Sequence, residues 1–160
     1  MAEVAAIAAE AGIIAAFEPE VSNVVDSALK ARRLLDEIAS PHLRVVMDAS
    51  NLFRAGDLPR MREVLDEAFD LLGDDVVLIH AKDLRRDGAA GQEAAGTGVL
   101  DYDHYLLRLR RIGWAGPLIL HSLSEAQVPA AAAFLRARIA ALGEREARRP
   151  GGAGGHAPSG

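Results

Sequence analysis

Cysteine is absent from the sequence, and this absence removes several kinds of chemistry at once. The chain can form no disulfide, no thiolate zinc cluster and no cysteine nucleophile, so any metal would have to be bound by His, Asp or Glu. A chain without disulfides is typical of the cytoplasm, which is the location we expect.

The sequence also has fewer basic than acidic residues, and it has no long apolar run. The 18 basic residues are outnumbered by 23 acidic ones, which gives a formal net charge of -5. No overall cationic field is therefore available to hold polyanions. No uninterrupted apolar stretch is long enough to cross a bilayer, and the N-terminus lacks a basic segment followed by an apolar core. We therefore expect no membrane partner, and the sequence disfavours nucleic acid.

What remains is the composition of a globular domain. Half of the 160 residues (50%) are hydrophobic and 26% are charged, as in an α/β or helical domain. Four short apolar runs indicate buried strands, and they are continuous rather than alternating, as in parallel strands covered on both faces. These runs are Ile13–Phe17, Leu43–Met47, Val76–Ile79 and Leu118–Leu120.

Helical patterns lie before, between and after these strands. Apolar residues recur at steps of three and four in Val24–Ile38, where Ser22 or Asn23 can cap the helix. Gly or Pro punctuates the other helical patterns, which cover Ala2–Glu10, Met61–Leu72, Tyr102–Ile112 and Ala130–Leu142. The alternation of strand and helix predicts an α/β fold with a parallel sheet and right-handed crossovers.

Two other segments differ from this pattern. From residue 144 onward the sequence is charged and then rich in Gly and Pro, which predicts a disordered tail over 144–160 and a single domain over 1–143. The connection Arg85–Val99 contains several glycines and is long for a link between a strand and a helix. Loops of that length are often functional.

Acidic and imidazole side chains follow the four predicted strands. They are Glu18, Asp48, His80 and His121, and parallel α/β folds bind ligands at this carboxyl end of the sheet. Two carboxylates and two imidazoles suit a divalent ion such as Mn²⁺, Co²⁺ or Zn²⁺, and Mg²⁺ less well.

Each of these four residues also has a structural interpretation. Glu18 could be an exposed loop residue, with Glu20 as its rival for the site. Asp48 could form an Asx-turn or cap a helix. His80 could be a core histidine with satisfied hydrogen bonds, and His121 could cap the helix that follows it.

Five motifs taken together resemble the sugar phosphate isomerase/epimerase family, the xylose isomerase-like TIM barrels. Their order and spacing match that family over about residues 1 to 142. The motifs are Phe17-Glu18-Pro19-Glu20, Val45-Val46-Met47-Asp48 with Asn51, Ile79-His80-Ala81-Lys82-Asp83, Gly96-Thr97-Gly98-Val99-Leu100-Asp101-Tyr102 and Gly113-Trp114-Ala115-Gly116-Pro117-Leu118-Ile119.

The resemblance implies a metal-dependent sugar or sugar-phosphate isomerase or epimerase that moves a proton through a metal-stabilised enediolate. In that family a Glu, an Asp, a His and a last Glu hold a divalent ion at the barrel mouth. Glu18, Asp48 and His80 match the first three, which makes Glu18 the first catalytic candidate. Lys82 is expected to contact substrate.

The sequence departs from the family pattern at two site positions. His121 stands where the last strand of the family ends in Glu, so we expect it to bind metal or shuttle a proton as the second catalytic residue. Asn51 stands where many relatives have His and is expected to contact substrate. Arg86 resembles an arginine that contacts substrate oxygen, and Arg85 is an adjacent alternative.

Length is the remaining difficulty, because a complete barrel of this kind needs about 250 residues. The motifs belong to strands five to eight, so the fold expected is the C-terminal half of a (β/α)8 TIM barrel. We expect a truncated form with impaired activity. A non-catalytic half-barrel that assembles through its open sheet edges, as a homodimer or with a complementing N-terminal half, is the alternative. An abasic-site endonuclease of the same superfamily is disfavoured by the acidic balance.

Overall fold

The computed structural model describes residues 1–148 as a row of strands packed against a row of helices. The strands are β1 (Ala15–Phe17), β2 (Leu43–Asp48), β3 (Val76–Asp83), β4 (Glu93–Ala94) and β5 (Leu118–Leu120). The helices are α1 (Ala2–Ala11), α2 (Ala28–Ile38), α3 (Met61–Leu72), α4 (Tyr102–Arg111) and α5 (Val128–Ala147). Within residues 1–148, no helix combines the length and the apolar character that crossing a membrane requires.

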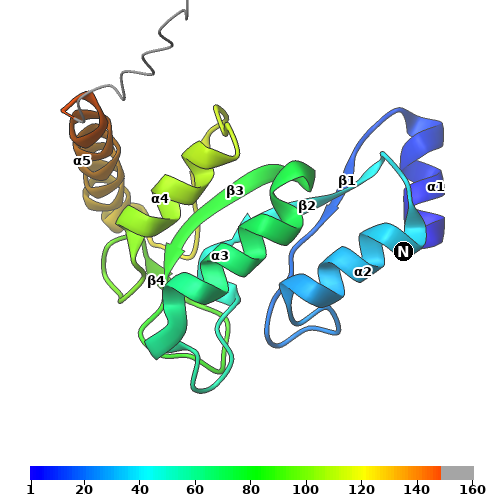
Figure 1. Ribbon diagram of the computed structural model, residues 1–160, viewed down its shortest axis with the longest axis horizontal. Coiled ribbons are helices and arrows are strands. Elements are labelled where there is room, and N and C mark those ends of the chain that lie inside the picture. The colour runs from blue at the N-terminus through cyan, green and yellow to red at the C-terminus, as the bar shows by residue number, and fades with distance from the viewer. Residues whose placement is uncertain (149–160) are drawn as a thin grey trace, which may run out of the picture.

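Four of the strands form one parallel sheet in chain order. β2 lies between β1 and β3, and β5 pairs with the other side of β3. The two-residue β4 pairs antiparallel with the end of β3 and belongs to the long loop that follows it. The helices succeed one another from α1 at one end to α5 at the other (Figure 1). The expected α/β architecture with a parallel sheet is confirmed.

The helices cover only one face of this sheet. Leu43, Val45 and Met47 alternate along β2 and are fully buried in the core. On β5, Ile119 points to the other face and is 37% exposed, while its neighbours Leu118 and Leu120 pack against the core. The expectation that both faces of the strands would be covered is therefore wrong for the described residues. An apolar run cannot by itself reveal whether its second face is covered by the same chain.

Two helix boundaries differ from the sequence-based expectation. Helix α2 begins at Ala28, because Ser27 is its N-cap and accepts a hydrogen bond from the Lys30 amide. Helix α5 continues through Gly143 to Ala147, into the segment expected to be disordered. One glycine in a helix costs only about 1 kcal/mol, which good helix formers on both sides can offset. The rest of the expected tail, residues 149–160, lies outside the described residues.

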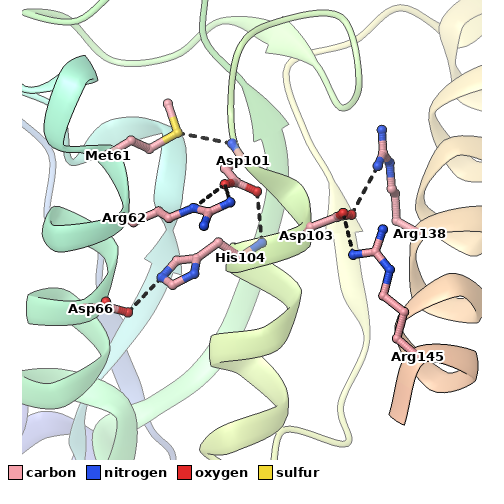
Figure 2. Close-up of polar contacts among 8 residues, drawn as sticks. All are labelled: Met61, Arg62, Asp66, Asp101, Asp103, His104, Arg138 and Arg145. Atoms are coloured by element: carbon pink, nitrogen blue, oxygen red, sulfur yellow. Dashed lines mark hydrogen bonds and ion pairs between the residues drawn. The ribbon is translucent and has the colours of Figure 1, made fainter. Parts of the chain in front are cut away.

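Ion pairs join the helices on the side away from the sheet (Figure 2). Arg62 of α3 contacts Asp101, the N-cap of α4, at 2.7 Å. Asp103 of α4 contacts Arg138 at 3.1 Å and Arg145 at 3.0 Å, both on α5. These contacts tie α5 to α4.

A buried carboxylate organises the long loop after β3. Asp83 is 1% exposed and accepts hydrogen bonds from the backbone amides of Leu84 at 2.9 Å, Gly96 at 3.1 Å and Leu100 at 2.9 Å. Gly98 packs so closely that a Cβ there would overlap the Asp83 carboxylate and the Leu84 carbonyl oxygen. The loop is thus fixed at both ends to the end of β3.

We predict that Gly98→Ala destabilises the protein by about 1–3 kcal/mol, because the added methyl group has no room. The matched control is Gly143→Ala in α5, where a Cβ would meet nothing within 4 Å. That substitution is expected to be neutral or to stabilise the helix by up to about 1 kcal/mol. Urea denaturation followed by circular dichroism measures both. Equal free energies of unfolding for the two variants would contradict this account of the loop.

Candidate metal and catalytic site

The two-residue repeat of the strands collects the predicted site on the face that the helices leave bare. Asp48 ends β2 and pairs with His80 of β3, which in turn pairs with Ile119 of β5. His121 comes two residues after Ile119, so it lies on the same face of its strand. Glu18 directly follows β1 at the same end of the sheet.

The side chains of four predicted ligands meet at this edge. Potential ligand atoms of Asp48, His80 and His121 all lie within 4.8 Å of one another. His80 Nδ1 is 3.3 Å from Glu18 Oε2 and 3.6 Å from Asp48 Oδ2. The structure therefore brings Glu18, Asp48, His80 and His121 into one cluster.

The two histidine rings stack on each other. Their centroids are 4.7 Å apart and their planes are 7° from parallel. His121 Nδ1 lies 3.0 Å from the hydroxyl of Ser122. Ser122 has a φ of 54°, a left-handed conformation that non-glycine residues rarely adopt. The 3-10 helix that follows is capped by Ser124, so His121 does not serve as its cap.

Asp48 uses its two carboxylate oxygens differently. Oδ1 accepts hydrogen bonds from the Ser50 amide at 3.1 Å and from the Ser50 hydroxyl at 2.7 Å, and this turn starts a short 3-10 helix. Oδ2 faces the cluster, 3.3 Å from the ammonium group of Lys82. The structural and the functional interpretations of Asp48 are thus compatible, because each needs a different oxygen.

Lys82 belongs to the buried part of the site. Its side chain is 3% exposed, and two tyrosines hold the strand that carries it. The Tyr102 hydroxyl donates to the Lys82 carbonyl at 2.8 Å, and the Tyr105 hydroxyl donates to the His80 carbonyl at 3.1 Å. Sequence reasoning did not assign these tyrosines, although Tyr102 was part of a recognised motif.

Asn51 orients Glu18. Its side-chain amide donates to Glu18 Oε1, while its own oxygen accepts the Gly91 amide at 3.1 Å. The contacts with Asn51 and His80 identify Glu18, rather than Glu20, as the glutamate of the cluster. Arg86 lies exposed on the loop after β3, and no hydrogen bond or ion pair among residues 1–148 joins it to the cluster. Its neighbour Arg85 pairs with Glu93 at 2.7 Å.

The environment moves the pKa values of the two carboxylates apart. Burial, followed by the negative charge of Asp48, raises the pKa of Glu18. Burial acts in the same direction on Asp48, but contact with His80 and the charge of Lys82 outweigh it and lower the pKa of Asp48. Two carboxyl groups whose pKa values differ in this way can take different roles. The group with the raised pKa is suited to accept or donate a proton.

The two histidines are shifted in opposite directions as well. Contact with Asp48 raises the pKa of His80 against the effect of burial, and Glu18 adds to the rise. Burial and the neighbouring His80 lower the pKa of His121. His121 therefore favours the neutral form, in which an imidazole nitrogen can accept a proton or a metal ion.

The donor atoms present fit a divalent cation. Asp48 Oδ2 and His80 Nδ1 are buried and have no hydrogen-bond partner in the described part of the chain. The contacts that these two atoms make are ionic, at 3.3 Å from Oδ2 to the Lys82 ammonium and at 3.3 Å from Nδ1 to Glu18 Oε2. Carboxylate oxygen together with imidazole nitrogen is a donor set for Mn²⁺, Co²⁺ or Zn²⁺. The cluster is therefore a candidate metal centre at the carboxyl end of a parallel sheet.

Parallel strand-and-helix units with functional side chains at the carboxyl ends of the strands are the arrangement of TIM barrels. The family described as xylose isomerase-like TIM barrel matches residues 1–138. Because this match covers most of the chain, the chain belongs to that family. No curated protein sequence matches it.

Solved structures share this fold. The chain is similar to a D-tagatose 3-epimerase-like protein with a TM-score of 0.73 and 18% identity, over 89% of this chain and 53% of that one. A xylose isomerase domain protein from Planctomyces limnophilus gives 0.72 and 23%, over 89% and 51%. A 3-keto-D-glucoside 4-epimerase from E. coli gives 0.53 and 20%, over 88% and 49%. The chain thus has the fold of a partial TIM barrel and spans about half the length of these structures.

In metal-free protein, we predict that His80 titrates above the ordinary histidine pKa of 6.5 and His121 below it. A raised pKa means that the folded state binds the proton more tightly. The contribution of His80 to stability is therefore complete below pH 6.5 and lost as the pH rises through its raised pKa. NMR titration of the ring protons measures both values, and His121→Ala assigns them by removing one signal. The reverse order of pKa values would contradict this electrostatic picture.

We also predict that Asp48→Asn lowers the pKa of His80, because contact with the Asp48 carboxylate is the largest cause of its rise. The same NMR titration measures this shift. Asp66→Asn, which changes the partner of the distant His104, is the matched control and should leave the His80 pKa in place.

Proposed function

We propose that the chain carries the metal-binding and proton-transferring part of a sugar or sugar-phosphate isomerase or epimerase. The observation that carries the proposal is the convergence of Glu18 with the possible metal ligands Asp48, His80 and His121 at one edge of the sheet. Membership of the xylose isomerase-like family supports it. The names of the similar structures, which include sugar epimerases, point in the same direction.

In this proposal Glu18, Asp48, His80 and His121 hold a divalent ion. Asp48 remains charged because its pKa is lowered, and Lys82 offsets part of the negative charge of the two carboxylates. When bound, the ion would act as a Lewis acid that polarises the carbonyl and alcohol oxygens of the sugar. Imidazole donors favour Mn²⁺, Co²⁺ or Zn²⁺ over Mg²⁺.

Proton transfer falls to Glu18 and His121. The raised pKa of Glu18 brings its carboxylate closer to the basicity that a general base needs at neutral pH, and Asn51 fixes its orientation. Glu18 takes a proton from the carbon beside the sugar carbonyl. Inversion at that carbon requires a second group that returns a proton to the other face. His121, at the opposite end of the cluster from Glu18, can return the proton only as an imidazolium that is not bound to the ion, so metal binding and proton return are alternative roles for this residue.

Substrate contacts complete the proposed site. Asn51 and Lys82 lie beside Glu18 and Asp48, but both are buried, at 0% and 3% exposure, so in this proposal they hold the two carboxylates in position. Arg86 is exposed on the adjoining loop, from which its guanidinium could bind a phosphate or hydroxyl group of the substrate. The chain spans about half the length of its structural neighbours. We therefore include in the proposal that complete turnover needs a second half-barrel to enclose the sugar, while the cluster of this chain alone supports the exchange of the proton beside the carbonyl.

Metal binding tests the ligand assignment. Isothermal titration with Mn²⁺, Co²⁺ and Zn²⁺ is expected to show one ion per chain, and both His80→Ala and His121→Ala should weaken binding on the order of 100-fold. His42→Ala is the matched control, because His42 lies at the opposite end of β2 and contacts the Ile13 carbonyl. Unchanged affinity in both site variants would refute the metal site.

Exchange of hydrogen for deuterium tests the proton transfer. Metal-loaded protein incubated in D2O with a panel of ketohexoses and their phosphates should incorporate deuterium at the carbon beside the carbonyl, as followed by proton NMR. Glu18→Gln is expected to lower the rate at least 100-fold, because it removes the base. Glu20→Gln should leave the rate unchanged. Equal loss in both variants would show that Glu18 has no special role.

A further inference from the structure

One aromatic side chain of helix α4, Tyr105, reaches the main chain behind the metal cluster. Tyr105 is 1% exposed and belongs to the hydrophobic core. Its ring packs against Phe69 of α3, with ring centroids 5.8 Å apart, and against Tyr102, with centroids 6.0 Å apart. Full burial between two other rings restricts the motion of such a side chain. The position of the Tyr105 hydroxyl is therefore set by the packing of the helices.

The Tyr105 hydroxyl lies where strands β2 and β3 separate. Asp48 and His80 form the last pair of residues in register between these two strands. Beyond this pair β2 turns into the short 3-10 helix Ala49–Asn51, whereas β3 continues to Asp83. The hydroxyl donates a hydrogen bond to the His80 carbonyl at 3.1 Å. It thus contacts the main chain at the point where the pairing of the two strands stops.

The end of β2 acts on the same hydroxyl. Burial raises the pKa of Tyr105 well above its ordinary value, and the negative charge of Asp48 adds to the rise. The backbone amide of Ala49, the residue that follows Asp48, hydrogen-bonds to Tyr105 and acts in the opposite direction. A hydroxyl oxygen can accept a hydrogen bond from an amide while its own proton is donated elsewhere, here to the His80 carbonyl. Tyr105 is therefore neutral, and it contacts the ends of both strands.

The separation of Asp48 and His80 matters because both are candidate ligands of one ion. Asp48 Oδ2 and His80 Nδ1 lie 3.6 Å apart. Metal–ligand bond lengths vary by only about 0.2 Å, so two ligands of one ion must be held at a nearly constant separation. The main chains that carry these two side chains diverge directly after the pair. A contact that joins the two main chains at this point can hold the separation of the ligands.

We propose that Tyr105 is a positioning residue that sets the separation of the metal ligands Asp48 and His80. Its hydroxyl acts on the main chain of the two strands and is not itself a ligand. Tyr102 differs from it, because the Tyr102 hydroxyl donates to the Lys82 carbonyl at 2.8 Å, two residues beyond the last pair of β2 and β3. The inference rests on the proposed metal site and adds to it a residue outside the ligand set.

Substitution of Tyr105 by Phe tests the role of the hydroxyl, because it removes one oxygen atom and keeps the packed ring. Tyr105→Phe is expected to weaken Co²⁺ binding about 10-fold in isothermal titration, as the loss of a group that orients a metal ligand does. It should also change the visible absorption bands of bound Co²⁺, which report the geometry of the ligands. Thr97→Val is the matched control, because it removes a hydroxyl that donates to the Ala94 carbonyl at 2.8 Å in the loop after β3. The control should change neither the affinity nor the spectrum.

The outcomes separate this inference from the proposed function. If the wild-type protein binds no Co²⁺, the proposed metal site fails and the role of Tyr105 fails with it. If the wild-type protein binds Co²⁺ and Tyr105→Phe leaves both the affinity and the spectrum unchanged, the role of Tyr105 is refuted while the metal site stands. A weaker affinity with an unchanged spectrum, or an equal loss in Thr97→Val, would indicate a general loss of stability and would also overturn the inference. Circular dichroism verifies that each variant is folded.

Fluorine NMR gives a second measurement that needs no substitution at Tyr105. The sequence contains only two tyrosines, so protein labelled with 3-fluorotyrosine gives two signals, which Tyr102→Phe assigns. Saturation with Zn²⁺ is expected to shift the Tyr105 signal, because a fluorine beside the hydroxyl reports its hydrogen bonds to the strand ends. His80→Ala, titrated with the same amounts of Zn²⁺, should show a smaller shift. A Tyr105 signal that stays in place when the wild-type protein is saturated would overturn the inference.

Discussion

One geometrical constraint underlies the whole structure: each parallel strand has one face against the helices and one face that the helices leave uncovered, and the two-residue repeat assigns every side chain to one of them. Leu43, Val45 and Met47 build the core on the covered face. Asp48, His80 and His121 fall on the bare face at the carboxyl ends, where their ligand atoms lie within 4.8 Å of one another. A shift of one residue in any strand would exchange these sets and bury polar side chains among the helices. Fold and site are therefore specified by the same register.

Buried charge shapes the chemistry that this register makes possible. Asp48 is almost fully buried, and Ser50 and Lys82 supply the contacts that make its negative charge tolerable. Its charge then acts on its neighbours, raising the pKa of His80 and contributing to the raised pKa of Glu18. Glu18 thus becomes more basic beside a carboxylate that remains ionised. That difference between two adjacent carboxyl groups is the physical basis for assigning the base to Glu18 and a ligand role to Asp48.

The sequence predicted the parallel α/β fold and all four clustered residues, because short apolar runs followed by polar residues mark the carboxyl ends of buried strands. It also identified Asn51 and Lys82, which the structure places against Glu18 and Asp48. Ser50, Tyr102 and Tyr105 were not assigned, since their contacts depend on packing between segments distant in sequence. The apolar runs alone indicated strands covered on both faces, because a continuous apolar run looks the same whether the second face meets helices or a barrel interior; the match to half a barrel is what predicted an uncovered face. The start of α2 was misplaced because Ser27, rather than Ser22 or Asn23, caps that helix.

The proposed metal centre requires that the imidazoles of His80 and His121 and the carboxylates of Glu18 and Asp48 bind one divalent ion. X-ray absorption spectroscopy of the Co²⁺-loaded protein tests it most directly, because imidazole rings give a characteristic multiple-scattering signal. We predict two imidazole ligands together with oxygen ligands in the wild-type protein, and one imidazole ligand in His121→Ala. A cobalt centre that shows no imidazole scattering, or that His121→Ala leaves unchanged, would contradict it.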